Sequence, residues 1–426
     1  MNFSDLNIES EIIPFFDDSL NRHSREALTL LFHSMPKSIT EAAERQQVIK
    51  GFTANLANIK NLYSYKRDLE EAYEFCCRLE SQLPASKTNL REFKMTLLFS
   101  RRKKEQLFSR SIQLLTLFER IYRHYCSRLD LNEFPVSYKA SILTIADTLN
   151  GFEKEWTLLS EKRNGLSAGE VAAFMHRLYV FFKSGQLLKC WSELFLFEAY
   201  LSIAVVAQKA TFVPAQFIDK GIILTNFFHP LLKAPVKNSI HLDRNVLVLT
   251  GPNMSGKSTL LRSISLCVYL ARLGLPVPAA ECKVVFVSAI NVYINSRDTL
   301  HSGYSHFMTE VLNLKESIIA ARDGKQVFTV FDELFSGTNV DDALNMLRLT
   351  LNGLKKYSGS YFLLSTHFYK LKEQQVEAMD HAAFYYIDSF LEEGTPKFTY
   401  RLKEGWSDVK FGTLLFEREG LVQLLT

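Results

Sequence analysis

The chain has few of the residues that several protein classes require. Its 426 residues include only 18 glycines and 11 prolines, too few for a collagen-like or low-complexity chain. A hydrophobic share of 47% and a charged share of 23% also exclude a disordered chain, because the sequence has enough apolar surface to form a core. The length predicts two or three domains.

Cysteine motifs and long apolar runs are missing as well. The six cysteines contain no C-x-x-C pair and lie in apolar or helical surroundings, as reduced cysteines of cytosolic proteins do. We therefore expect neither a disulfide framework nor a zinc site. The longest apolar run, residues 194–207, is interrupted by Glu198 and is shorter than the roughly 20 residues of a membrane span. The amino terminus carries acids where a signal peptide carries Lys or Arg, so we expect a cytoplasmic protein without a transmembrane helix.

The charge is weak overall but uneven along the chain. A net charge of +4 is too small to make the whole surface attract nucleic acid or membrane. Residues 90–130, however, contain ten Lys and Arg against four acids, including the run Arg101, Arg102, Lys103 and Lys104. This stretch is either a surface that neutralises DNA phosphates or simply a solvated helix face.

The spacing of apolar residues changes near residue 210. Between residues 24 and 200 they recur at helical intervals, whereas later residues form short strand-like runs that alternate with amphipathic helices. The pattern predicts an all-α domain over residues 1–210 and an α/β domain with a mixed or parallel sheet over residues 211–426.

A phosphate-binding loop is the strongest local motif. The segment from Gly251 to Thr259 fits G-x-x-x-x-G-K-[ST], with a buried strand before it and a helix after it. In such a loop the glycines let backbone N–H groups surround phosphate oxygens, the lysine binds the β and γ phosphates, and the serine hydroxyl ligates Mg²⁺. The motif predicts ATP and Mg²⁺ as ligands and a binding set of Gly251, Pro252, Asn253, Met254, Ser255, Gly256, Lys257, Ser258 and Thr259.

Two later strands end in polar residues that suit ATP hydrolysis. The strand at residues 327–331 precedes Asp332, a second Mg²⁺ ligand beside Ser258, and Glu333, a candidate general base. The strand at residues 361–366 precedes His367, placed to approach the γ phosphate. Taken alone, the two acids suit an exposed strand end and the histidine a packed core position. After a phosphate-binding loop, they predict an ATPase whose catalytic residues are Lys257, Glu333 and His367.

The order of these motifs is typical of ABC-type ATPases, and their sequences resemble the MutS family of DNA mismatch-repair ATPases. The resemblance covers roughly residues 194–415 and is carried by GPNMSGKST (251–259), FDELFSGTN (331–339) and STHFYKL (365–371), with flanks at residues 217–232 and 273–284.

The resemblance implies further features. Residues 298–318 resemble the signature loop of the family, so Ser305 is expected to reach the γ phosphate bound by the opposite subunit of a dimer. It also implies that Asn253 contacts phosphate, that the segment around Val236 and Ile240 packs against adenine, and that the helical half resembles the core and lever helices of the family.

Three departures qualify this resemblance. The chain begins in helical sequence, so we expect no amino-terminal mismatch-reading module with its Phe-x-Glu wedge. Phe335, Ser336 and Asn339 replace the Gly, Arg and Ser that usually follow the family's Asp-Glu pair. The chain also stops near Leu425, where the family continues into a helical dimerisation segment, so a dimer would rest on the ATPase faces.

The sequence favours an ATP-dependent DNA-binding protein of the mismatch-repair MutS type, in which the nucleotide state moves helical arms on DNA. Two other hypotheses stay open. One is a nucleotide-switched module that binds a protein partner, and the other is a binder of branched or recombination DNA that does not recognise mismatches. The preferred DNA structure and the downstream partner are not encoded in any motif that we identify.

Overall fold

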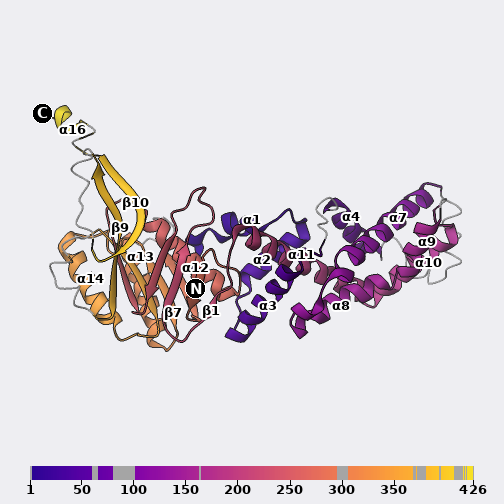
Figure 1. The fold of residues 1–426 in the computed structure, drawn as a ribbon, viewed down its shortest axis with the longest axis horizontal. Coiled ribbons are helices and arrows are strands. Elements are labelled where there is room, and N and C mark those ends of the chain that lie inside the picture. Colours follow the sequence, from indigo (N-terminus) through magenta and orange to yellow (C-terminus); the bar gives the residue numbers. More distant parts are fainter. Residues whose placement is uncertain are drawn as a thin grey trace. The chain divides into compact units, whose positions relative to one another are not determined.

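The structure is a computed structural model, and its chain divides into two compact units (Figure 1). The sheet unit combines Met1–Ile12, Pro36–Ala42 and Ala210–Thr426, and the helical unit combines Ile13–Met35 and Ala43–Lys209. The structure describes residues 2–59, 66–79, 101–162, 165–294, 306–367, 371, 380–392, 395–406, 416, 418 and 420–425.

The helical unit contains helices and short turns, with no strand among its described residues. A capping box of Ser167 and Glu170 starts one helix, and the packed rings of Phe118, Phe152 and Trp191 lie in the core. The predicted all-α character of this half is therefore confirmed. Its elements are α1 (Ile13–Phe16), α2 (Arg22–His33), most of α3 (Ile39–Asn55), α4 (Lys66–Cys77), α7 (Arg101–His124), the 3-10 turns Cys126–Arg128 and Leu131–Glu133, α8 (Val136–Asn150), α9 (Glu153–Glu161), α10 (Ala168–Lys183) and α11 (Gln186–Ala210).

Helix α11 contains the long apolar run of the sequence. By length and composition alone it could cross a membrane, but 61% of its most apolar window is buried inside the protein. A mostly buried apolar helix is also what the core of a globular protein contains. It is the one candidate span found among the described residues.

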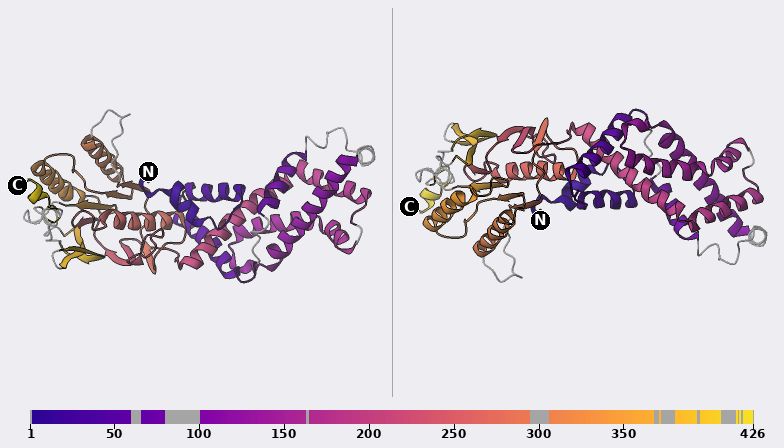
Figure 2. Two further views of the ribbon diagram at one scale, coloured as in Figure 1. Left: turned by 90° about the horizontal axis from the view of Figure 1, so that it is seen from above. Right: turned by 90° about the horizontal axis from the view of Figure 1, so that it is seen from below.

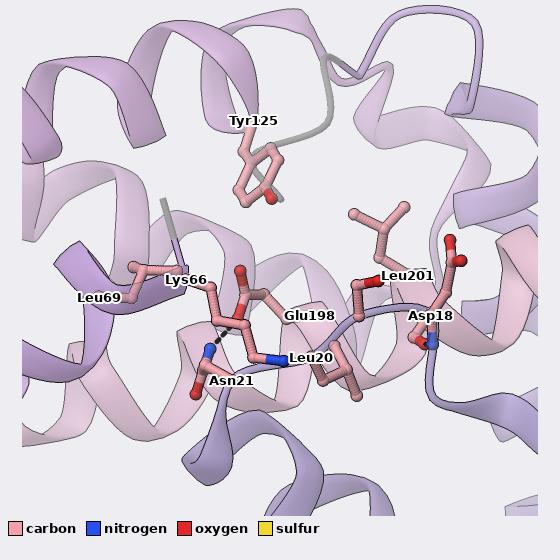
Figure 3. Close-up of a pocket in the computed structure, with 10 residues that line it drawn as sticks. Asp18, Leu20, Asn21, Lys66, Leu69, Tyr125, Glu198 and Leu201 are labelled. Atoms are coloured by element: carbon pink, nitrogen blue, oxygen red, sulfur yellow. Dashed lines mark hydrogen bonds between the residues drawn. The ribbon is translucent and has the colours of Figure 1, made fainter. Parts of the chain in front are cut away.

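Glu198 of α11 is buried against the amino terminus of α2. Its carboxylate accepts hydrogen bonds from Ser24 Oγ at 2.5 Å and from Asn21 Nδ2 at 2.6 Å. Figure 3 shows Glu198 beside a small pocket, with about 370 Å³ of empty space, that Lys66 and Tyr125 also line. Desolvation raises the pKa of Glu198 to about 7, although both hydrogen bonds act to lower it. The charge of this carboxyl therefore changes near neutral pH.

The sheet unit contains two sheets. The larger has the strand order β10-β9-β4-β8-β7-β6 and is parallel except for the antiparallel pair β9 and β10, while the smaller has the order β1-β5-β2-β3. Every residue of β4, β7 and β8 is buried, which agrees with their uninterrupted apolar sequences. The strands are β1 (Gln216–Phe217), β2 (Ile222–Phe227), β3 (Asn238–Leu242), β4 (Val246–Thr250), β5 (Glu281–Val284), β6 (Ala289–Tyr293), β7 (Val327–Phe331), β8 (Tyr361–Thr366), β9 (Ala382–Glu392) and β10 (Thr395–Glu404).

Helices pack against these sheets. The long helices α13 and α14 share a buried apolar cluster with β4, β7 and β8, whereas α12 contacts β8 of the large sheet and β2 and β5 of the small one. The large sheet is the mixed, mostly parallel sheet that the sequence predicts, whereas the smaller sheet, in which β2 pairs antiparallel with both β3 and β5, was not predicted. The helices are α12 (Lys257–Leu273), α13 (His306–Arg322), α14 (Val340–Leu354) and the short α16 (Leu421–Leu425).

Two amino-terminal segments, Met1–Ile12 and Pro36–Ala42, belong to the sheet unit. The sequence-based boundary near residue 210 assigned both of them to the helical domain. The main chain of Asn2 pairs with the edge strand β6 next to Asn291, and the amino terminus lies beside this sheet in Figure 2. Asp5 Oδ2 accepts a hydrogen bond from the backbone N–H of Ile294 at 2.8 Å. In the second segment, the carbonyl oxygen of Pro36 accepts a hydrogen bond from the buried Arg272 guanidinium. These contacts join residues that lie far apart in the sequence.

Candidate functional site

The loop between β4 and α12 has the conformation that its glycines allow. Gly251, Met254 and Gly256 have φ angles of 146°, 70° and 98°. Such angles favour glycine, and a Cβ atom added at Gly251 would lie 3.1 Å from Ser255 Oγ. The Ser255 hydroxyl is buried and has no hydrogen-bond partner among the described residues. The loop thus curves around a space that is lined by backbone groups and contains an unsatisfied hydroxyl, as a ligand-binding loop does.

Lys257 is the first residue of α12, and its side chain points back into this loop. Its Nζ donates to the carbonyl oxygens of Gly251 at 3.0 Å and Pro252 at 3.2 Å, and to Asn253 Oδ1 at 3.4 Å. It also lies 3.5 Å from Glu333 Oε1. The ammonium group is buried yet well partnered, and it is available to an anion that enters the loop.

Three polar residues from three elements meet beside Lys257. The hydroxyls of Ser258 and Ser365 each donate to one carboxylate oxygen of Asp332. Ser258 is the second residue of α12, Asp332 follows β7, and Ser365 lies near the end of β8. A hydroxyl beside a carboxylate supplies the hard oxygen ligands that Mg²⁺ prefers, and Mg²⁺ commonly takes few protein ligands together with substrate phosphates and water. The residues present therefore fit a magnesium ion.

Glu333 lies at the centre of the site. Its backbone N–H donates to Ser365 Oγ at 2.9 Å, and His367 Nδ1 lies 3.8 Å from its Oε2 atom. Because β8 lies between β4 and β7, the histidine that follows β8 comes between the lysine loop and the acidic pair. The structure thus brings Lys257, Asp332, Glu333 and His367 together at one edge of the sheet.

The turn after Glu333 has an uncommon backbone conformation. Glu333 and Phe335 have φ angles of 55° and 67°, each of which costs on the order of 1–3 kcal/mol for a residue other than glycine. The Phe335 ring is buried in the cluster that α13 and α14 share, 6.4 Å from the ring of Phe307. The backbone N–H of Phe335 donates to Glu310 Oε2 at 3.0 Å. The turn is therefore held by side chains from outside it.

Two pockets open beside the loop. The polar cleft has about 1070 Å³ of empty space, and Asn253, Lys257, Ser258, Asp332 and Glu333 are among the residues that line it. The second pocket has about 900 Å³ of empty space and is more apolar. Its lining residues include Phe227, Phe228, His229, Leu232, Val236 and Tyr400.

Tyr400 connects the two pockets because it lines both. It lies at an irregularity in the pairing of β9 with β10, has a φ angle of 57°, and its carbonyl oxygen accepts a hydrogen bond from Asn238 Nδ2 at 3.0 Å. A Cβ atom added at Gly256 would lie 3.1 Å from its ring. The ring of Tyr400 thus lies beside the glycine that precedes α12.

Not every residue predicted from the sequence is placed at the site by the described part of the structure. Ser305 is outside the described residues. The run from Arg101 to Lys104 begins α7, but its side chains are also outside the description. Val236 lines the apolar pocket, whereas Ile240 is buried in β3 and is not among the lining residues.

The sequence reasoning missed Tyr400, Ser365 and Glu310. Ser365 could have been found, because it lies in the same strand-end segment as His367. Tyr400 lies in no motif that we identified, and the position of Glu310 against the turn depends on how α13 packs.

The comparisons with known proteins agree with this geometry. Residues 247–422 match the family described as MutS domain V. Similar proteins are the DNA mismatch repair protein MutS of Bacillus licheniformis (30% identical over 268 residues), of Bacillus pumilus (31% over 274) and of Persephonella marina (30% over 285). The aligned regions cover 61%, 61% and 65% of this chain but only 29%, 31% and 32% of those relatives.

The chain therefore spans about 30% of the length of the MutS proteins that it matches. Within this shared part lie the loop before α12, the acidic pair after β7 and the strand that ends before His367. The resemblance seen in the motifs is confirmed for this part of the chain. Residues 247–422 thus match the MutS domain V family, which is an ABC-type ATPase domain.

Proposed function

We propose that this chain hydrolyses ATP to ADP and phosphate in the polar cleft. The observation that carries the proposal is the cluster of Lys257, Ser258, Asp332 and Glu333 around that cleft. Lys257 binds the β and γ phosphates, and the loop residues from Gly251 to Thr259 surround them with backbone N–H groups. Magnesium, held by Ser258 and Asp332, neutralises phosphate charge when it is bound.

Glu333 is the proposed general base. Its carboxylate is partly exposed to the cleft, so it can accept a proton from a water molecule there. In the structure the carboxylate pairs with Lys257. A triphosphate that takes over Lys257 releases Glu333 from that ion pair, which links substrate binding to exposure of the base. His367, 3.8 Å from the other carboxylate oxygen, is placed to contact the γ phosphate.

The apolar pocket is the proposed adenine site. It adjoins the loop at Gly256 and is lined by aromatic rings, which suit a flat base better than a phosphate. Burial lowers the pKa of His229, so its imidazole favours the neutral form in this pocket. Tyr400 lies between the two pockets, where a nucleotide that occupied both would touch its ring.

The proposed biological role is ATP-dependent DNA binding of the MutS type. Its support is the name of the relatives, DNA mismatch repair protein MutS, together with the basic run at the start of α7. Nucleotide state would move helical arms that hold DNA through its phosphates, and two copies would join through their ATPase faces with Ser305 completing the partner's site. Whether mismatched, branched or perfect duplex DNA is preferred is left for the experiment to decide.

The ATPase rate with different DNA forms tests this role. We would measure steady-state hydrolysis by the wild type and by Glu333→Gln with no DNA, perfect duplex, mismatched duplex and a four-way junction. Stimulation by one DNA form, absent in the variant, supports the proposed role and identifies the substrate. A rate that no DNA changes contradicts the DNA role but leaves the ATPase, and it favours a switch that acts on a protein partner.

Salt dependence provides an independent test of the DNA contact. Binding through phosphates weakens steeply as salt rises, because each neutralised phosphate releases counterions. We expect duplex affinity to fall by at least roughly tenfold between 50 and 200 mM salt. Replacing Arg101, Arg102, Lys103 and Lys104 by Gln should flatten this dependence. Affinity that does not change with salt would show that phosphate contacts do not hold the DNA.

A further inference from the structure

The backbone that carries Glu333 needs support from outside its own turn. Both Glu333 and Phe335 have φ angles in the left-handed region, which side chains other than glycine seldom adopt. A turn with two such residues keeps its shape only where neighbouring groups hold it. One of these groups is Ser365, whose hydroxyl accepts the backbone N–H of Glu333.

The second support comes from α13. Glu310 is 7% exposed, and its Oε2 atom accepts the backbone N–H of Phe335 at 3.0 Å. Because a carboxylate acceptor in a buried setting makes a stronger hydrogen bond than a neutral group, this contact is a firm link between the helix and the turn. Phe307, one turn earlier on α13, also approaches the ring of Phe335.

This link bears directly on the proposed base. Only Leu334 separates Phe335, which Glu310 contacts, from Glu333, so a change in the Phe335 backbone reorients Glu333. Proton transfer depends steeply on position, and a shift of about 1 Å can lower a rate by roughly 100-fold. The side chain of Glu310 does not line the cleft. Its hydrogen bond to Phe335 gives it an indirect route to the base, through the turn.

We propose that Glu310 is a positioning residue for ATP hydrolysis, which ties α13 to the Glu333–Phe335 turn and so fixes the orientation of the general base. This inference rests on the proposed ATPase function. It assigns Glu310 no contact with ATP or with magnesium. It also implies that a displacement of α13 changes the orientation of Glu333 through the hydrogen bond between Glu310 and Phe335.

The test compares three variants in the full chain. Glu310→Ala removes the acceptor, Glu310→Gln keeps an oxygen that can accept the Phe335 N–H, and Glu316→Ala removes an exposed glutamate of the same helix as a matched control. For each variant we would measure kcat and KM for ATP, the Kd of a fluorescent ATP analogue, the melting temperature, and hydrogen exchange of the peptide that contains residues 333–337.

For Glu310→Ala we expect kcat to fall by roughly 30- to 100-fold, while the Kd of the analogue stays within about threefold. Exchange of the turn peptide should rise. Glu310→Gln should recover most of the lost kcat, and Glu316→Ala should behave as the wild type. A loss of kcat at nearly constant Kd, with rescue by Gln, distinguishes positioning from general destabilisation. A destabilised fold would lower both the fraction of active protein and the melting temperature.

Two results would overturn the inference. One is an unchanged kcat in Glu310→Ala in a chain whose wild type hydrolyses ATP, which leaves the ATPase in place and removes the role of Glu310. The other is an equal loss of nucleotide binding and of kcat in both Glu310 variants, which assigns Glu310 to the fold alone. A wild type that does not hydrolyse ATP would instead contradict the proposed function, and this inference with it.

Discussion

Lys257 Nζ lies 3.5 Å from Glu333 Oε1, so the cation of the phosphate-binding loop and the proposed general base form an ion pair. The lysine side chain is 5% exposed and the glutamate side chain 32% exposed, which leaves the carboxylate as the partner that reaches the cleft. ATP would compete with Glu333 for the same ammonium group. Substitutions at these two positions should therefore differ in their effects on binding and on hydrolysis.

We expect Lys257→Ala to lose most nucleotide binding. The substitution removes the buried positive charge that faces the phosphates, and hydrogen bonds of a charged group are worth about 1.5–3 kcal/mol each. The Kd of a fluorescent ATP analogue should rise by roughly 100-fold or more. Lys283→Ala, a partly exposed lysine of β5 that pairs with Glu281, is the control and should bind as the wild type does. Normal binding by Lys257→Ala would refute the assigned role.

We expect Glu333→Gln to bind ATP and barely hydrolyse it. The amide cannot accept a proton from water, and loss of a general base typically lowers a rate by about 10²–10⁴-fold. Binding should be equal or tighter, because the variant has no carboxylate to compete for Lys257 or to repel the γ phosphate. A rapid-quench assay together with an equilibrium binding assay measures both quantities. Turnover at the wild-type rate would mean that another group is the base.

We expect Tyr400→Ala to weaken the binding of ATP without weakening that of inorganic triphosphate. Tyr400 lines both pockets, so its ring should contact the nucleoside but should be dispensable for phosphates alone. Loss of the ring should raise the Kd of ATP by about tenfold, as expected for an aromatic contact of about 1 kcal/mol plus buried area. Tyr400→Phe keeps the ring and should bind normally. Equal losses of affinity for ATP and for inorganic triphosphate would mean that Tyr400 supports the conformation of the loop and does not contact the nucleoside.

We expect Glu198→Gln to stabilise the helical unit at pH 8. The pKa of Glu198 is raised from 4.5 to about 7 in the folded chain, so the folded state holds a proton that the unfolded state releases above pH 4.5. The stability contributed by Glu198 is therefore fully present below about pH 4.5 and is lost as the pH rises to about 7. The upper bound on this loss is about 3 kcal/mol.

Hydrogen exchange of the α2 and α11 peptides between pH 5 and pH 8 measures this effect, after correction for the intrinsic exchange rates. The wild type should lose protection as the pH rises, whereas Glu198→Gln should not. The exposed Glu161→Gln is the control and should follow the wild type. Parallel curves for the wild type and Glu198→Gln would mean that Glu198 does not titrate in this range.

Local rules of chain conformation made the loop before α12 predictable. Gly251 and Gly256 mark two of its three positions with positive φ, and the lysine and serine follow at fixed spacing. The acidic pair was predictable for a similar reason, since a fully buried apolar strand ends directly before it. The prediction of helix before residue 210 rested on apolar periodicity such as that of residues 107–125, most of which form α7, with Leu115 and Phe118 buried.

Features that depend on pairing between distant segments were not predictable. The main chain of Asn2 pairs beside Asn291, and a backbone hydrogen bond of this kind needs no particular side chain. The conformation of Phe335 was not predictable either. Its positive φ is unexpected for an aromatic residue and is maintained by packing and by Glu310. Tyr400 approaches the loop from a part of β10 that pairs irregularly with β9, and no local sequence pattern marks that irregularity.

The pairing of Asn2 with β6 also affects how the chain folds during synthesis. Residue 2 leaves the ribosome long before its partner strand, which follows almost 290 residues later. At about 5–20 residues per second, this takes on the order of tens of seconds. Throughout that interval the amino-terminal segment has no partner, while the intervening helices emerge complete and can pack. The edge of the large sheet can therefore close only after the helical unit has been synthesised.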